Sequence, residues 1–257
     1  MNQLVIAWDL DETLGSWVQL GSIWDILKKT TPNKATQYHF NILMKLFPEY
    51  LRPNILKTLN TLKMKKKKDK NIRVVLFTNN QAPQSWARQI INFFNDRLDY
   101  KLFTDIIPAY MVDGIHIAKC RTSHDKKYDD MMKCLKLTHG TQVCFIDDQW
   151  HEDMNNKYVE YIHLYPYEYI LPNKEIIKRL SRSKLARQLR IADPFTLKKI
   201  ERLLNEFIFT PVIPNHSEIV SEISITKEIT KIILKFIKKT PSTRKRRKYR
   251  KNKTRKK

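Results

Sequence analysis

The stretch "AWDLDETLG" at residues 7–15 places two aspartates, Asp9 and Asp11, one residue apart at the end of an apolar run, and Glu12 follows at once. Neighbouring carboxylates repel one another and lose hydration when they are buried, so their position at the end of a strand is costly. Three interpretations are open: an exposed helix-capping turn, a metal site, or a nucleophile beside its acid partner.

Four further apolar runs are typical of buried strands, and helical patterns separate most of them. Strands that alternate with helices predict an α/β, Rossmann-like fold: a parallel sheet with helices on both faces. The strands are expected within residues 4–10, 73–80, 101–110, 141–149 and 157–167. The helices are expected within residues 17–27, 38–46, 52–63, 83–94 and 124–137, with an exposed loop at the lysine run 63–70.

Polar side chains end two more of these strands. Thr78 and Asn79 follow the second strand, and Asp147 and Asp148 follow the fourth. In open α/β sheets the ligand site lies outside the carboxyl ends of the strands. We therefore expect these groups to converge with the two aspartates of the first strand.

Four segments, in order, make the chain resemble the haloacid dehalogenase (HAD) superfamily of phosphatases. They are "DLDET" at 9–13, Thr78 in "LFTNN", a lysine near the start of a helix, and "FIDD" at 145–148. With "LRP" at 51–53, the chain looks most like the NLI-interacting-factor group, which includes phosphatases of the RNA polymerase II C-terminal domain. Similar stand-alone proteins occur in large DNA viruses.

The resemblance implies a Mg²⁺-dependent phosphatase. Asp9 would be the nucleophile that forms an aspartyl-phosphate, and Asp11 the general acid and base. Mg²⁺ prefers hard oxygen ligands and neutralises both the phosphoryl group and its attacker. Its implied ligands are Asp9, Asp147, Asp148 and the backbone carbonyl of Asp11.

The remaining site residues would bind the phosphoryl group. Thr78 would donate a hydrogen bond to it, with help from Asn79. A lysine would balance charge in the transition state. Lys126 is favoured for that role, followed by Lys127 and then Lys119.

His151 and Asp153, which follow the last acidic pair, have roles that the sequence leaves open. His151 could line the crevice, although a place in a surface loop is favoured. Asp153 has the same ambiguity, because in some relatives an acid a few residues past this pair helps to position the metal.

The sequence predicts a phosphatase core over residues 1–173 with a small insert at 15–51, so the cap is small or absent. A helical extension follows at 174–237, in which Asp193 and Pro194 are expected to start a helix. A disordered basic tail ends the chain at 238–257. No substantial insert is evident between Thr78 and Lys126.

The charge is strongly positive and unevenly placed. The formal net charge is +23, and residues 238–257 hold 13 basic and no acidic side chains. That tail fits nucleic-acid binding, an anionic membrane surface, or solubility alone. "RKRRK" at 244–248 also fits nuclear import.

The cysteine count and the apolar runs bear on location. Three cysteines without metal-ligand spacing fit a reducing intracellular compartment, cytoplasmic or nuclear. No apolar run is long enough for a membrane span, and no signal peptide is evident. The three cysteines are Cys120, Cys134 and Cys144.

These features favour a phosphatase that acts on a phosphorylated macromolecule, with a phosphoprotein as the first substrate. A nucleic-acid 3′-phosphatase or a nucleotidase is the alternative within the same chemistry. A non-catalytic scaffold that associates with nucleic acid is the alternative from another class.

Overall fold

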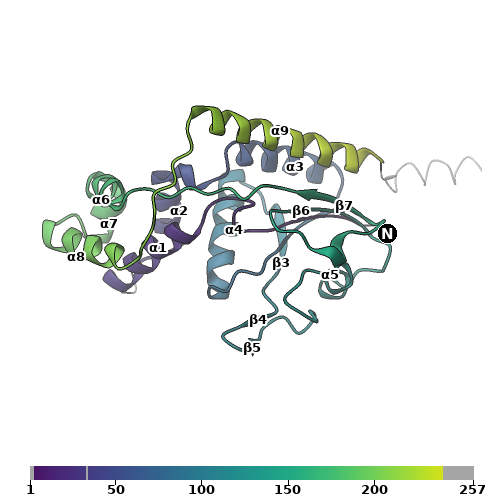
Figure 1. The fold of residues 1–257 in the computed structure, drawn as a ribbon, viewed down its shortest axis with the longest axis horizontal. Helices are drawn as coiled ribbons and strands as arrows, with labels where there is room; N and C mark the ends of the chain where they lie inside the picture. Colours follow the sequence, from purple (N-terminus) through teal and green to yellow (C-terminus); the bar gives the residue numbers. More distant parts are fainter. Residues whose placement is uncertain (1–2, 33, 240–257) are drawn as a thin grey trace, which may run out of the picture.

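Five parallel strands form the central sheet of the computed structural model, which describes residues 3–32 and 34–239 (Figure 1). The strand order is β3-β2-β1-β6-β7, so the first strand lies in the middle. This arrangement confirms the predicted α/β class. The bounds are β1 (Leu4–Trp8), β2 (Ile72–Phe77), β3 (Phe103–Ile107), β6 (Gln142–Asp147) and β7 (Val159–His163).

Strand β1 is buried on both faces, which explains its unbroken apolar run. Ile6 and Trp8 pack into one hydrophobic cluster, and Val5 and Ala7 pack into another on the opposite face. Both faces of the sheet are therefore covered, as predicted.

The two faces carry very different numbers of helices. Core residues of α5 alone join the cluster of Val5 and Ala7, and core residues of every other α-helix described join the cluster of Ile6 and Trp8. The first five helices are α1 (Val18–Thr30), α2 (Gln37–Leu46), α3 (Ile55–Lys68), α4 (Gln84–Leu98) and α5 (Tyr128–Leu135), and the 3₁₀ turns are η1 (Pro48–Tyr50) and η2 (Glu152–Met154).

The C-terminal third is helical, as predicted. Asp193 caps α8 by accepting the backbone N–H of Thr196 at 2.9 Å, with Pro194 in the first turn. Helix α9 lies along α3 (Figure 1). None of the described helices combines the length and apolar character needed to cross a membrane. The bounds are α6 (Asn173–Arg182), α7 (Lys184–Leu189), α8 (Pro194–Asn205) and α9 (His216–Lys239).

The expectation of an exposed loop at the lysine run is wrong, because α3 continues to Lys68. Lysine is a good helix former, and the apolar spacing of Leu59 and Leu62 continues to Lys66. Lys66 is 8% exposed, and its Nζ donates to the carbonyl oxygen of Leu102 at 2.6 Å. The long side chain lies along the core and ends at a carbonyl.

Lys66 makes stability depend on pH. Burial lowers the pKa of Lys66 to about 8, so the unfolded chain binds more protons than the folded one above that pH. The free energy of unfolding of the wild type is therefore expected to rise between about pH 8 and pH 10, relative to Lys66→Met, by up to about 1.4 kcal/mol per pH unit. Urea denaturation at several pH values measures this difference. Lys68→Met, at an exposed position, controls for the loss of one charge. If the free energies of unfolding of wild type and Lys66→Met changed with pH in parallel, the prediction would be wrong.

A small hairpin separates β3 from α5, where no substantial insert is predicted. It consists of β4 (Met111–Val112) and β5 (Ile115–His116), which pair antiparallel. Asp113 and Gly114 between them both have positive φ, 49° and 76°, as a tight two-residue turn requires. The hairpin projects from the body of the molecule (Figure 1).

The strand order places a topological switch point between β1 and β6. The chain runs outward from β1 to β2 and β3, and then returns to the other side of β1 with β6 and β7. Ligands of open α/β sheets bind outside the carboxyl ends of the strands at such a point. Asp9 follows β1 and Asp147 ends β6, so both lie at this position.

Candidate active site

The loop after β1 is held tightly by the backbone and by one tryptophan. The N–H of Asp9 donates to the carbonyl of Ile146 at 2.9 Å, and Trp17 Nε1 donates to the carbonyl of Leu10 at 2.8 Å. Gly15 is required here, because a Cβ at this position would lie 2.4 Å from the carbonyl oxygen of Tyr50. The loop therefore has little freedom to move the two aspartates.

Lys126 joins the ends of β1 and β6. Its Nζ donates to Asp9 Oδ1 and, at 2.6 Å, to Asp147 Oδ2. All three residues are at least nine-tenths buried. The second oxygen of Asp147 accepts the backbone N–H of Gln149 at 2.8 Å, so both oxygens of Asp147 have partners within the protein.

Burial shifts the pKa values of this cluster. Burial would lower the pKa of Lys126, but the carboxylates of Asp9 and Asp147 outweigh it and raise that pKa. Burial also raises the pKa of Asp9, and Lys126 opposes this rise. One ammonium group thus faces two carboxylates in a low-dielectric environment, where its attraction to them is strong.

Asp148 lies beside this cluster and is held by Thr13. Thr13 Oγ1 donates to Asp148 Oδ1 at 2.8 Å, and the backbone N–H of Asp148 donates to Thr13 Oγ1 at 3.1 Å. Asp9, Asp147 and Asp148 each offer an oxygen within 4.8 Å of the others. Three carboxylate oxygens so close together fit a hard divalent cation such as Mg²⁺.

Asp11 turns away from Lys126 and towards the loop after β2. Asn80 Nδ2 donates to both oxygens of Asp11, at 3.0 and 2.9 Å. Burial raises the pKa of Asp11, and the Asn80 hydrogen bonds oppose this rise. Sequence reasoning missed Asn80 and named Asn79, because nothing in two adjacent asparagines shows which side chain turns inward.

Thr78 directly follows β2 and is 2% exposed. Its Oγ1 accepts the backbone N–H of Asn80 at 3.0 Å, which shapes the loop that carries the asparagine. Arg121, also buried, donates to the Thr78 carbonyl at 3.2 Å and to the carbonyl of His124 at 2.9 Å. Arg121, which sequence reasoning also missed, thereby ties β2 to the loop that presents Lys126.

The other two candidate lysines, Lys127 and Lys119, form no ion pair with Asp9 or Asp147 among the described residues. Lys127 pairs with Asp153 at 3.4 Å, where the Asp153 side chain is 57% exposed. Lys119 is exposed on the preceding loop. The structure therefore brings Lys126, and not Lys127 or Lys119, to Asp9.

The expectation that His151 lies in a surface loop is wrong. His151 is 7% exposed, and its Nε2 lies 3.6 Å from Asp147 Oδ2 without a hydrogen-bond partner in the described part of the chain. Its Nδ1 faces the backbone N–H of Lys126 at 3.5 Å. The 3₁₀ turn η2 after it directs the ring inward, a feature that no local pattern indicates.

The cysteines also differ from expectation. A reducing compartment would keep all three as thiols, but Cys120 and Cys134 form a disulfide with their Cα atoms 5.0 Å apart. Cys144 is free and buried. The disulfide joins the loop before Lys126 to α5, so it brackets the lysine that contacts the aspartates.

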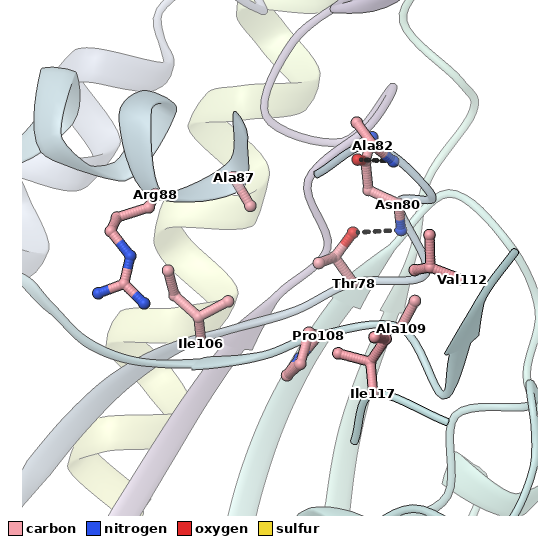
Figure 2. Close-up of a pocket in the computed structure, with 10 residues that line it drawn as sticks. All are labelled: Thr78, Asn80, Ala82, Ala87, Arg88, Ile106, Pro108, Ala109, Val112 and Ile117. Atoms are coloured by element: carbon pink, nitrogen blue, oxygen red, sulfur yellow. Dashed lines mark hydrogen bonds between the residues drawn. The ribbon is translucent and has the colours of Figure 1, made fainter. Parts of the chain in front are cut away.

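Two cavities adjoin the loop after β2. One, of about 100 Å³, lies between α4, the end of β3 and the hairpin, with Thr78 and Asn80 on one wall and Arg88 on another (Figure 2). The other, of about 320 Å³, lies between α1 and α4 and is lined by Asp11 and Trp86. Both offer space next to the candidate catalytic groups.

Comparison with known proteins yields little. No protein-family model matches the chain, and no curated protein matches it. A solved structure, the HAD domain of the effector protein Lem4 from Legionella pneumophila, is similar over 70% of this chain and 95% of that domain. The two share 16% sequence identity with a TM-score of 0.42. Similarity at this level says nothing about activity.

Proposed function

We propose that the chain is a Mg²⁺-dependent phosphatase of the HAD type, which hydrolyses a phosphate monoester through an aspartyl-phosphate. One observation carries the proposal: buried Lys126 bridges Asp9 and Asp147 where β1 and β6 meet at the switch point. An ammonium group at this position can neutralise an incoming phosphoryl group that two carboxylates alone would repel.

Asp9 is the proposed nucleophile. Its Oδ1 is held by Lys126, so the carboxylate is oriented and its second oxygen can attack phosphorus. Thr78 and Asn79 follow β2 and are proposed to donate hydrogen bonds to the phosphoryl oxygens. In Asn79 the donor would be Nδ2; its Oδ1, an acceptor, is buried without a hydrogen-bond partner among the described residues.

The metal would be held by carboxylate oxygens, with the backbone carbonyl of Asp11. Asp9, Asp147 and Asp148 are the proposed ligands, because each offers an oxygen within 4.8 Å of the others. A bound Mg²⁺ would supply charge neutralisation for the phosphoryl group. Asp147 remains a proposed ligand, and its contact with Lys126 gives it a second role.

Asp11 is the proposed general acid and base. Burial raises the pKa of Asp11, so its carboxyl group holds a proton more readily than an exposed one and can deliver it to a leaving group. The 320 Å³ cavity beside Asp11 offers room for that leaving group. Asn80 would orient the carboxyl group while the proton moves.

Replacing Asp11 with asparagine tests this division of labour. We expect steady-state hydrolysis of an aryl phosphate with Mg²⁺ to fall roughly 10²- to 10⁴-fold, because a proton carrier is lost. Aryl leaving groups need little protonation, so the first step should survive and Asp9 should remain phosphorylated. Intact-mass spectrometry measures the added phosphoryl group, with chelated wild type as the control. Full activity in Asp11→Asn would contradict the assignment.

The proposed substrate is a phosphorylated macromolecule, first a phosphoprotein as in the NLI-interacting-factor group. In its described residues the predicted insert at 15–51 consists of α1, α2, η1 and connecting loops, so this segment supplies no large lid there. A nucleic-acid 3′-phosphatase or nucleotidase is the alternative, and so is a non-catalytic scaffold. The domain boundaries, the intracellular location and a viral origin stay predictions.

The basic surface supports a second proposal, binding of nucleic acid. The exposed lysines of α9 include Lys231, Lys235 and Lys238, and α3 ends in four lysines beside it. From residue 240 on, the tail lies outside the described residues. The full chain is expected to bind an oligonucleotide with an affinity that falls steeply with salt.

Charge removal on α9 tests this second proposal. Lys235→Gln with Lys238→Gln should weaken oligonucleotide binding and reduce the salt slope, because fewer phosphates are neutralised. Lys198→Gln with Lys199→Gln on α8 is the matched control. Fluorescence anisotropy in a salt series measures both. Equal losses from the two helices would contradict a specific role of α9.

A further inference from the structure

A buried arginine connects the C-terminal helix to the loop after β1. Arg52 is 1% exposed. Its Nε donates to the carbonyl of Thr13 at 2.8 Å, and its Nη2 donates to the carbonyl of Glu12 at 2.5 Å and that of Tyr165 at 2.8 Å. Its Nη1 donates to Glu222 Oε2 on α9 at 2.6 Å. One guanidinium group thus spans three segments of the chain.

Glu222 balances the charge of this guanidinium group. Among the described residues, Glu222 is the single ion-pair partner of Arg52, because the other hydrogen-bond partners of Arg52 are neutral carbonyl oxygens. Burial lowers the pKa of Arg52, and Glu222 is the group that most opposes this change. A buried charge without its partner is costly, so loss of the Glu222 charge would disturb the set of hydrogen bonds that Arg52 makes.

Helix α9 holds Glu222 in a fixed place beside α3. Thr226 Oγ1 donates to the carbonyl of Pro53 at 2.8 Å, and the hydroxyls of Thr58 and Thr230 lie 2.7 Å apart. Helix α9 therefore docks along α3 through polar contacts on the turns that follow Glu222. The carboxylate of Glu222 therefore approaches Arg52 from a rigid helix, and the Glu222 side chain is 16% exposed.

The Arg52 contacts continue to the candidate metal site. The carbonyl that accepts from Arg52 Nε belongs to Thr13, and the Thr13 hydroxyl binds both Asp148 Oδ1 and the Asp148 N–H. Glu12 adopts a left-handed backbone with φ of 58°, which a rigid set of hydrogen bonds must maintain. Asp148 is thus held by Thr13, whose carbonyl accepts from Arg52, and Arg52 also holds the backbone of the adjacent Glu12.

We propose that Glu222 is a positioning residue for the metal site: through Arg52 and Thr13 it sets the place of Asp148. The inference rests on the proposed function only for its effect on turnover. Groups that orient metal ligands typically change metal affinity 10- to 100-fold, and Glu222 acts two contacts further out. Glu222→Gln in the full chain is therefore expected to weaken Mg²⁺ binding roughly threefold to tenfold.

Isothermal titration with Mg²⁺, well below the unfolding temperature, measures this effect without any turnover. The Mg²⁺ concentration for half-maximal hydrolysis of an aryl phosphate should rise by the same factor. Glu228→Gln is the matched control, because Glu228 lies on the same helix, is 60% exposed and, in the part of the chain that the structure describes, forms an ion pair with Lys231 alone. It should bind Mg²⁺ as the wild type does.

Arg52→Lys separates positioning from simple stability. Lysine keeps the charge but lacks the planar guanidinium group, from which Arg52 makes four hydrogen bonds. If Glu222 acts through Arg52, Glu222→Gln adds little further loss of Mg²⁺ affinity in the Arg52→Lys background. The inference is overturned if the losses simply add, or if Glu222→Gln lowers the unfolding temperature but binds Mg²⁺ like Glu228→Gln. A wild type that binds Mg²⁺ but hydrolyses nothing would overturn the phosphatase and leave this comparison intact.

Discussion

Asp9→Asn is expected to lower kcat for an aryl phosphate on the order of 10⁴-fold or more, as the loss of a nucleophile does in other enzymes. The amide keeps the shape of the carboxylate and still accepts a hydrogen bond from Lys126, but it cannot attack phosphorus. Burial already disfavours the Asp9 carboxylate, so its replacement by a neutral group should change stability little.

Steady-state kinetics and thermal unfolding, each with and without Mg²⁺, measure the two parts of this prediction. Asp153→Asn is the matched control, because Asp153 is largely exposed and, within residues 3–32 and 34–239, forms its one ion pair with Lys127 at 3.4 Å. It should retain nearly full activity. If folded Asp9→Asn kept a tenth of the wild-type rate, Asp9 would not be the nucleophile.

Lys126→Met is expected to reduce both activity and stability. Without the ammonium group, Asp9 and Asp147 face one another in a buried site with no positive charge between them. Removal of one partner from a buried ion pair costs about 3–5 kcal/mol. Loss of a group that stabilises transition-state charge lowers kcat roughly 10²- to 10³-fold.

Lys127→Met is the adjacent control. The pair of Lys127 with Asp153 is at the surface, and such pairs contribute about 0–1 kcal/mol. Urea denaturation with and without Mg²⁺ compares the variants, and Mg²⁺ should restore part of the lost stability of Lys126→Met. Similar losses in the two variants would show that the buried contacts of Lys126 are not special.

The polar residues at the carboxyl ends of the strands can be predicted from the sequence, because each lies next to an apolar run in the chain. The three central strands β2, β1 and β6 are mainly apolar, and Asp9, Thr78 and Asp147 directly follow or end these runs. Parallel pairing then brings residues more than a hundred positions apart together. Lys126 contacts Asp9 across 117 positions.

Other features depend on geometry that no local pattern carries. The choice between Lys126 and Lys127 follows from the direction in which the chain enters α5, and spacing alone left it open. Asn80 faces Asp11 because its Oδ1 accepts the N–H of Ala82 at 2.9 Å, which turns the side chain inward. Arg52 and Glu222 lie 170 positions apart, and each is of a residue type that is usually exposed, so nothing in the sequence indicates their contact.

That separation also has a consequence for the order in which the protein can be built. Ribosomes add about 5–20 residues per second, so Glu222 emerges roughly 10 to 30 seconds after Arg52. Until then the arginine lacks the carboxylate that pairs with it in the folded chain. The middle strand β1 gains its neighbour β6 earlier, once residues 142–147 have been made. The loop that carries Asp9 therefore completes its hydrogen bonds to Arg52, and Arg52 its ion pair, only after Glu222 has been made.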